Sequence, residues 1–383
     1  MLNQRLQKAL AQQKTKQLYR NLDIRDSSQG AEVIYDGKTY LSFCSNDYLG
    51  LANHPDVVKA FKDAADVYGV GSGASHLLSG HCDVHHALEE ELAAFLNYPA
   101  VLLFSTGYMA NLGVIDTFTK RGDLLIQDHN NHASLIDAGL LARGEMRRYR
   151  HNDLEHLQHI LEKTQHENKL IVTQGVFSMS GELAPLPEII QLAKSHQACL
   201  MVDDAHGIGC LGETGRGTLE HWHLTHKDVP ILVGTLGKAL GSFGAFVAGE
   251  KNSIEALRQF ARTYIYTTAL PPAVCAATRA SLATLQKENW RHPHLKFLIQ
   301  AFQKGAEKIG LVISPSITAI QSIPIGNEKK AMTLSETLHK RGILIKAIRS
   351  PTVAFGHACL RISLSAAHTI EHIQFLLENL SDL

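Results

Sequence analysis

The chain has 383 residues, in which 37 basic residues balance 37 acidic ones, and neither sign gathers into a long run. This balance gives no reason to expect nucleic acid or a membrane surface as a partner. No apolar run approaches the ~20 residues that a membrane-spanning helix needs. The six cysteines form no C-x-x-C pair, so we expect reduced thiols in a cytoplasmic protein. A chain of this length is expected to form two or three domains.

Two groups of histidines deserve a check for metal binding. They are His81, His85 and His86 with Glu89 on a helical stretch, and His221, His223 and His226 in a polar connector. Neither group has the H-E-x-x-H pattern. We expect most of these histidines to be solvated and no metal to be bound, with a histidine-rich zinc hydrolase as an alternative.

The first 20 residues are basic, contain Leu2, Leu6 and Leu10, and lack the apolar core of a signal peptide. Their composition could mimic an organelle transit peptide, but serine is absent. We expect an amphipathic arm packed on the body of the protein. Alternation then predicts a strand pair over 32–41, and a helix is expected from His54 to about Tyr68.

The middle of the chain alternates short apolar runs with helical segments. The runs are 101–104, 123–128, 170–173, 199–202 and 231–233. This alternation predicts a mainly parallel sheet covered by helices on both faces. After Trp290 a helix over 295–309 and short strands near 311–312, 319–325, 343–344 and 359–365 predict a smaller α+β domain.

Chemically useful side chains follow the ends of the predicted parallel strands, where ligands of such sheets bind. The first run leads into a small-residue turn over 105–111 that opens a helix, and the amides of such a turn suit a phosphate. The later runs lead to His132, to Ser178, to Asp203 with His206, and to Thr235 with Lys238. Each residue alone could be structural, but together they predict a site at one edge of the sheet.

Lys238 lies between glycines and has no charged neighbour from 231 to 249. Desolvation lowers a lysine's pKa, and a neutral lysine can form a Schiff base with an aldehyde cofactor. A Walker A loop is disfavoured because Ala239 and Leu232 stand where it requires a hydroxyl residue and a glycine. A structural lysine in a tight turn is the simpler alternative. The glycine cluster at 69–80 follows a helix rather than a strand, which argues against a dinucleotide loop.

Arg361 lies in the alternating segment 359–365 and points away from the side of Leu360 and Ile362. It therefore faces either water or a site. Its forked guanidinium matches a substrate carboxylate.

The motifs together resemble the α-oxoamine synthases, which are pyridoxal-phosphate enzymes of the aspartate-aminotransferase fold, type I. The resemblance rests on Ser45–Gly50, on Ser178 within Val-Phe-Ser-Met, on Asp203–Gly207, on Thr235–Lys238, on Ala347–Val353 and on Leu360–Ser363. It runs from about Leu18 to the C-terminus. It implies a large cofactor-binding domain with a mainly parallel, seven-stranded type of sheet and a smaller α+β domain. The expected division is a segment 1–50, a large domain 51–288 and a C-terminal domain 289–383.

The resemblance also implies residue roles. Lys238 would hold pyridoxal phosphate and move the Cα proton, Asp203 would pair with the ring nitrogen, and His206 would bond the phenolic oxygen. His132 would stack on the ring, with Ser178 nearby. Further cofactor residues would be Gly107, Tyr108 and Thr235, with Thr267 from the other subunit of a homodimer. Substrate-binding residues would be Arg20, Asn46, Thr352 and Arg361.

The segments 348–353 and 364–368 favour the member of the family that serves biotin synthesis. That acyltransferase condenses L-alanine with pimeloyl-CoA or the pimeloyl acyl-carrier protein and releases 8-amino-7-oxononanoate, CO2 and the free thiol. Sister enzymes such as glycine C-acetyltransferase or an autoinducer-type acyltransferase are alternatives. A non-catalytic nucleotide-binding protein is the alternative from another class. Gln174, Ser180 and His76 depart from the family pattern, which leaves the acyl or carrier preference open.

Overall fold

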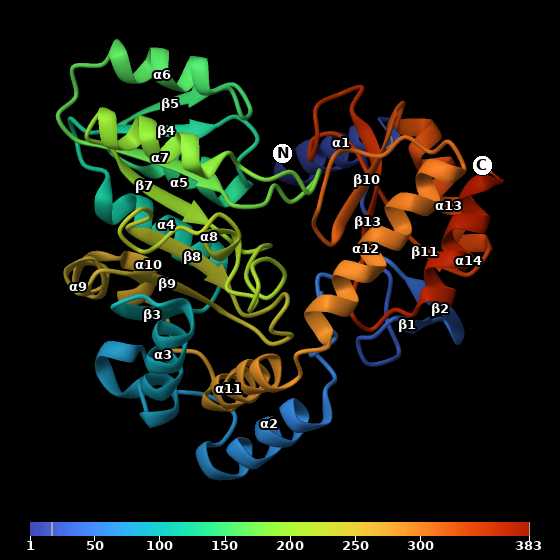
Figure 1. The fold of residues 1–383 in the computed structure, drawn as a ribbon, viewed down its shortest axis with the longest axis horizontal. Helices are drawn as coiled ribbons and strands as arrows, with labels where there is room; N and C mark the ends of the chain where they lie inside the picture. The colour runs from blue at the N-terminus through green and yellow to red at the C-terminus, as the bar shows by residue number, and fades with distance from the viewer. Residues whose placement is uncertain (17, 383) are drawn as a thin grey trace.

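A seven-stranded sheet forms the centre of the larger part of the molecule (Figure 1). The computed structural model describes residues 1–16 and 18–382; residues 17 and 383, which fall in the expected N-terminal segment and C-terminal domain, lie outside the described residues. The strands, in spatial order, are β3 (Ala100–Phe104), β9 (Ala245–Gly249), β8 (Ile231–Thr235), β7 (Cys199–Asp203), β6 (Lys169–Gln174), β4 (Leu124–Asp128) and β5 (Glu145–Tyr149). β9 runs antiparallel to both of its neighbours, and the other strands share one direction. The predicted mainly parallel sheet is confirmed.

Helices cover both faces of this sheet because successive strand residues point to opposite sides. Along β3, Leu102 and Phe104 contact one set of helices, while Val101 and Leu103 belong to the core on the other face. One face carries α4 (Gly107–Phe118), α5 (Ala133–Leu141), α9 (Lys251–Phe260) and α10 (Arg262–Ile265). The other carries α3 (Asp83–Leu96), α6 (Leu154–Glu162), α7 (Leu186–Ser195), α8 (Thr218–His221) and α11 (Pro272–Lys287), with α2 (Pro55–Tyr68) outside α11. The sheet is therefore buried on both sides.

The C-terminal part is built on a second, antiparallel sheet. The elements of this C-terminal part are α12 (Arg291–Lys308), β10 (Ile320–Gly326), α13 (Glu328–Lys340), β11 (Ile343–Leu344), β12 (Lys346–Ile348), β13 (Ala358–Ser363) and α14 (Ile370–Ser381). β13 lies between β10 and β12. The strand expected at 311–312 is wrong, because the Leu311 amide bonds back to the Ala306 carbonyl and closes the end of α12.

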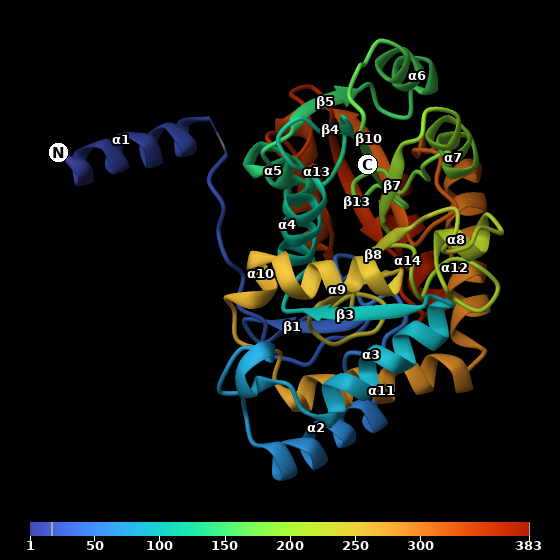
Figure 2. The same cartoon turned by 90° about the vertical axis from the view of Figure 1, so that its left-hand side faces the viewer.

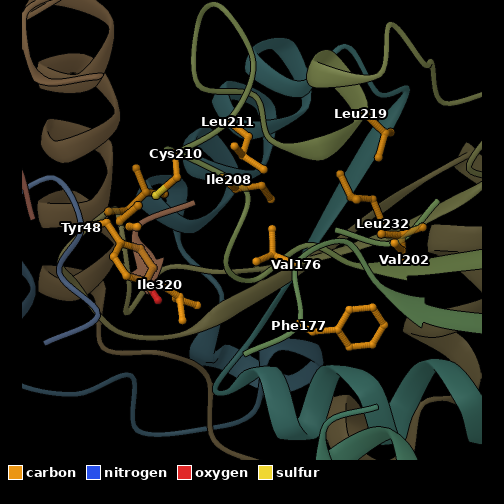
Figure 3. Close-up of a cluster of buried hydrophobic side chains, with 14 of the residues drawn as sticks. Tyr48, Val176, Phe177, Val202, Ile208, Cys210, Leu211, Leu219, Leu232 and Ile320 are labelled. Carbon is orange, nitrogen blue, oxygen red and sulfur yellow. The ribbon is translucent and has the colours of Figure 1, made fainter. Parts of the chain in front are cut away.

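The N-terminal strands join this C-terminal part rather than the large sheet. β1 (Glu32–Tyr35) pairs with β2 (Lys38–Ser42), and β2 pairs in parallel with β11. One hydrophobic cluster joins the two parts, with Tyr48 and Ile320 beside Cys210 and Ile208 (Figure 3). The expected boundary after residue 288 falls in the link between α11 and α12. We propose on this arrangement the division into 1–50, 51–288 and 289–383.

The first helix, α1 (Leu2–Thr15), extends away from the body (Figure 2) and buries no side chain. The expectation that this arm packs on the body is wrong in the single chain, since Leu2, Leu6 and Leu10 are all exposed. The segment after it is tied to the C-terminal part by the Tyr19 carbonyl, which accepts from Arg349 (3.1 Å). None of the helices in the described part of the chain combines the length and apolar character of a membrane span.

The turn after β8 packs closely against the segment that leads into α2. Gly241 has φ +62°, and a Cβ there would lie 2.3 Å from the Ala52 amide nitrogen. Gly241→Ala therefore meets both backbone strain and a backbone clash, and we expect a loss of about 3 kcal/mol of stability. Gly310→Ala is the control, because Gly310 has φ +70° but open space around it; strain alone predicts about 1 kcal/mol. Equal falls in Tm for the two variants would contradict the close packing.

Candidate active site

Lys238 lies in the turn that follows β8, at the carboxyl edge of the large sheet. The turn closes through the Gly241 amide, which donates to the Lys238 carbonyl (2.8 Å). Lys238 Nζ lies 3.0 Å from His206 Nε2. Burial lowers the pKa of Lys238 to about 8, with Asp203 opposing the shift and Arg361 adding to it. At pH 7 roughly one tenth of this amine is therefore unprotonated, far more than for a lysine of ordinary pKa.

His206 is held by a tyrosine from the N-terminal loop. Its Nδ1 lies 2.7 Å from the Tyr48 hydroxyl, which leaves Nε2 to face Lys238. Burial, with Lys238 nearby, lowers the pKa of His206 well below its usual range. The imidazole is therefore neutral at physiological pH.

Asp203 ends β7 and is buried, with both carboxylate oxygens engaged. Oδ2 accepts from Asn111 Nδ2 (2.8 Å), and Oδ1 accepts from the Ala205 amide (3.1 Å). Asn111 comes from α4 and also donates to Ser134 Oγ (2.9 Å). These bonds fix the carboxylate without neutralising it.

The start of α4 and the end of β8 form a small polar cradle. Gly107 is the first residue of α4, and a Cβ there would lie 3.0 Å from Thr235 Cγ2. Thr235 Oγ1 is buried without a hydrogen-bond partner among the described residues. The first amides of a helix lack intrahelical partners, so this pair of elements suits an anion. Tyr108 borders the cradle, and its hydroxyl donates to Asp137.

His132 and Ser178 come from two further strand ends. His132 is exposed, with Nδ1 2.8 Å from Ser134 Oγ, so one ring nitrogen is anchored while the ring is open to a ligand. Ser178 is half-buried, and its carbonyl accepts from Arg361 Nε (2.7 Å).

Arg361 reaches from β13 of the C-terminal part into this region and faces the site rather than water. Its Nη1 donates to Ser363 Oγ (2.8 Å) and its Nη2 to Asn46 Oδ1 (3.2 Å). The guanidinium meets no carboxylate within salt-bridge distance in the described chain. An arginine held by neutral partners can accept a carboxylate from a substrate.

Two cavities lie near this cluster, the first bordering it at Ser178 and the second sharing Thr352 with the first. One of about 850 Å³ is lined by Ser178 and Thr352 among others, and one of about 680 Å³ is lined by Arg20 and again Thr352. Thr352 therefore borders both spaces. Thr267 lies in the loop after α10, which is fixed near the start of α4 by Ser105 Oγ donating to the Thr268 carbonyl (3.4 Å).

The arrangement fits an aldehyde cofactor that carries a phosphate. Lys238 supplies an amine of lowered pKa, Asp203 a fixed carboxylate, and Gly107 with Thr235 an anion cradle that has an unpaired hydroxyl. The chemistry of this donor set matches the three functional groups of such a cofactor.

Three residues that hold the site were not singled out from the sequence. Tyr48, Asn111 and Ser134 each bond to a predicted site residue. Tyr48 and Asn111 lie within motifs that drew attention for other reasons, but no periodicity shows that a side chain will meet a residue some 100 positions away.

A charged histidine braces the strand ends that carry His132 and Ser178. His151 Nδ1 lies 2.9 Å from Asp128 Oδ1, and Nε2 lies 3.3 Å from Glu182 Oε2. Burial opposes the charge, but the bonds to Asp128 and Glu182 outweigh it and raise the pKa of His151 to about 9. The imidazolium thus ties the turn after β4 to the hairpin after β6.

His151→Gln should therefore destabilise the protein by about 2–3 kcal/mol at pH 7, since it leaves buried Asp128 without its cation. A pKa raised from 6.5 to about 9 gives stability that is full below pH 6.5 and is lost as the pH rises through about 9. The difference between wild type and variant should shrink by pH 10 in urea unfolding. His159→Gln, on the exposed face of α6, is the control, and a difference independent of pH would refute the charged brace.

Comparison with known proteins agrees with this geometry. Residues 38–380 match the profile of the aminotransferase class I and II family. The 8-amino-7-oxononanoate synthase of Cellvibrio japonicus is 54% identical over 382 residues, covering 100% of this chain and 96% of the relative. The enzyme of the same name from Methylococcus capsulatus is 54% identical, covering 98% and 97%.

Solved structures with the same fold are similar to this chain at lower sequence identity. A serine palmitoyltransferase from S. paucimobilis, solved with a bound PLP-myriocin aldimine, is 31% identical with a TM-score of 0.93, covering 98% of this chain and 96% of that one. An 8-amino-7-oxononanoate synthase from Francisella tularensis is 34% identical with a TM-score of 0.79, covering 90% and 97%. The chain belongs to the class I and II aminotransferase family of pyridoxal-phosphate enzymes.

Proposed function

We propose that this protein is an acyltransferase of biotin synthesis that uses pyridoxal phosphate to condense L-alanine with a pimeloyl thioester. The products are 8-amino-7-oxononanoate, CO2 and the free thiol. The observation that carries the proposal is the 54% identity, over the whole chain, to relatives named 8-amino-7-oxononanoate synthase. The lysine, carboxylate and anion cradle at the edge of the sheet support the same chemistry.

The cofactor, when bound, withdraws electrons from the amino acid Cα so that its bonds to hydrogen and to the carboxylate can break. Lys238 would hold the cofactor and then move the Cα proton, and its lowered pKa suits both tasks. Asp203 would keep the cofactor's ring nitrogen protonated, since Asn111 and the Ala205 amide hold its carboxylate in place. His206 would bond the phenolic oxygen, and the open ring of His132 would cover the cofactor face.

The phosphate would lie at the start of α4. Gly107 leaves room for it, Thr235 Oγ1 would donate to it, and Tyr108 and Ser178 would border the cofactor. Arg361 and Asn46 would bind the carboxylate of alanine, because their own contacts place the guanidinium beside the site.

The acyl thioester would enter through the cavities that meet at Thr352. Arg20 and Arg349 line the second cavity together with Lys346, which is paired with Asp23 of the same lining, so the two arginines supply free basic side chains. Such a lining suits the phosphates of coenzyme A and the prosthetic group of a carrier protein equally, so both donors remain in the proposal.

We also propose a homodimer in which Thr267 completes the cofactor site of the other subunit. Exposed apolar side chains support an interface here: Val70 and Leu78 are 90% and 83% exposed, and Tyr266 is 72% exposed. Their segments are neighbours, since the Ala269 amide donates to the Ala74 carbonyl (3.0 Å).

The cysteines of the chain are all unpaired, which supports a reducing cytoplasmic location.

A substrate panel tests the function directly. The purified holoenzyme is incubated with alanine, glycine or serine and with pimeloyl, acetyl or palmitoyl thioesters, and products are identified by mass spectrometry. We expect 8-amino-7-oxononanoate from alanine, with kcat/KM at least 10-fold above that for glycine, since one methyl group is worth about 10–200-fold. Rescue of a biotin-requiring strain is the matching test in cells. A preference for glycine with acetyl-CoA, or for serine with palmitoyl-CoA, would assign the chain to a sister activity.

Lys238→Ala tests the central residue. We expect pyridoxal phosphate to be no longer fixed to the protein by borohydride, because the attaching amine is gone. Turnover should fall by roughly 10³-fold or more, since the variant also lacks the proton-transfer group. Lys227→Ala, in the exposed connector before β8, is the control and should behave as wild type. If the Lys238 variant still held the cofactor covalently, Lys238 could not be the residue that attaches it.

A further inference from the structure

A cluster of histidines lies outside the site described above, around the N-terminal end of α3, a helix labelled in Figure 2. His76, from the π-turn η1 (His76–Gly80), lies with its Nδ1 2.9 Å from Nδ1 of His81. The expectation that the histidines of this stretch are solvated is wrong for His85, which is fully buried. His85 uses both nitrogens structurally, Nδ1 beside Cys82 Sγ (3.1 Å) and Nε2 at the Leu270 carbonyl (2.7 Å).

Two histidines of the cluster remain available and meet a buried carboxyl group. His81, His86 and Glu89 each offer a ligand atom, and these atoms lie within 4.8 Å of one another. His86 and Glu89 are three residues apart on α3 and so share a helix face. Bonds of 2.0–2.1 Å at tetrahedral angles put ligand atoms about 3.4 Å apart. The exposed His86 side chain is free to move toward the other two ligand atoms.

The surroundings already orient two of these ligands. His81 Nδ1 is engaged with His76, whose ring stacks on Tyr264 at 5.0 Å, so His81 Nε2 is left free. Glu89 Oε1 accepts from the Leu103 amide (3.0 Å), which leaves Oε2. Anchoring of a ligand through its second polar atom is the usual support of a protein metal site.

The charges around the cluster act in both directions. The positive charge of Arg258 disfavours a bound cation here. Glu90 lies with its Oε1 3.4 Å from His86 Nε2, so it competes with a metal ion for this nitrogen but adds a favourable negative charge.

We propose that His81, His86 and Glu89 form a binding site for a divalent transition-metal ion of the zinc class. Two imidazoles and one carboxylate are ligands that Zn²⁺, Ni²⁺ and Cu²⁺ accept, whereas Ca²⁺ and Mg²⁺ prefer oxygen alone. The site is separate from the Lys238 cluster and does not depend on the proposed reaction. Through His76 and Tyr264 the bound metal would brace the segment that leads to Thr267.

Calorimetric titration of the holoenzyme with Zn²⁺ tests this proposal. The chain carries no affinity tag and is first treated with chelator and dialysed. We expect one equivalent to bind per chain at micromolar or tighter concentration. Mg²⁺ at the same concentration should not bind, and Co²⁺ should give visible absorption typical of a four-coordinate site.

Variants decide whether these residues hold the ion. His81→Asn and His86→Gln should each weaken Zn²⁺ binding at least 10-fold, and the double variant should abolish the stoichiometric step. His221→Gln and His223→Gln, which alter the other histidine group, are matched controls and should bind as wild type. Glu89→Gln retains an acceptor for the Leu103 amide and tests the carboxylate if its Tm matches wild type. Absence of a saturable step below 100 µM, or a step that survives in the double variant, would overturn the site.

Discussion

The contact between the Lys238 amine and the neutral His206 imidazole is the interaction on which the rest of the site depends. Because the partner 3.0 Å from the amine is a neutral imidazole, burial outweighs the opposing charge of Asp203 and lowers the pKa of Lys238 to about 8. His206 stays neutral because burial and the nearby positive charges of Lys238 and Arg361 disfavour its protonation. The amine therefore keeps the reactivity that a covalent role requires.

Residues from every part of the chain hold the Lys238–His206 contact in place. β8 and β7 of the large sheet bring Lys238 and His206 together, the N-terminal loop supplies Tyr48 to orient the imidazole, and β13 supplies Arg361. Arg361 also bonds the Ser178 carbonyl, so the C-terminal part is joined to the hairpin after β6 at the same place. A change in how the two parts pack would thus change the electrostatic environment of the amine as well as the binding of a substrate carboxylate.

The sequence predicted the elements that repeat a simple pattern. Apolar runs separated by helical stretches predicted the large sheet, and the rule that ligands bind at the carboxyl ends of its strands predicted where Asp203, His206 and Lys238 would meet. Periodicity could not predict β5, because its Glu145, Arg147 and Arg148 are the polar residues of an edge strand. Tyr48 and Asn111 also escaped prediction, since their partners lie far away in the chain and only the folded chain brings them close. The exposed α1 is a different case, because amphipathic spacing predicts an apolar stripe but not what covers it.

Two of the departures from the family pattern, Gln174 and Ser180, fit the charges already present around the site. Gln174 faces Asp203 in the register of β6 and β7, and its Nε2 donates to the Asn130 carbonyl (3.2 Å). A carboxylate there would lose this bond and would add like charge beside Asp203. Ser180 supports the Glu182 amide (3.4 Å), and an acid in its place would add a third carboxylate around His151. Neutral residues at both positions therefore preserve the electrostatic balance that orients the cofactor's acid and the hairpin of Ser178, so the departures are compatible with an unchanged reaction.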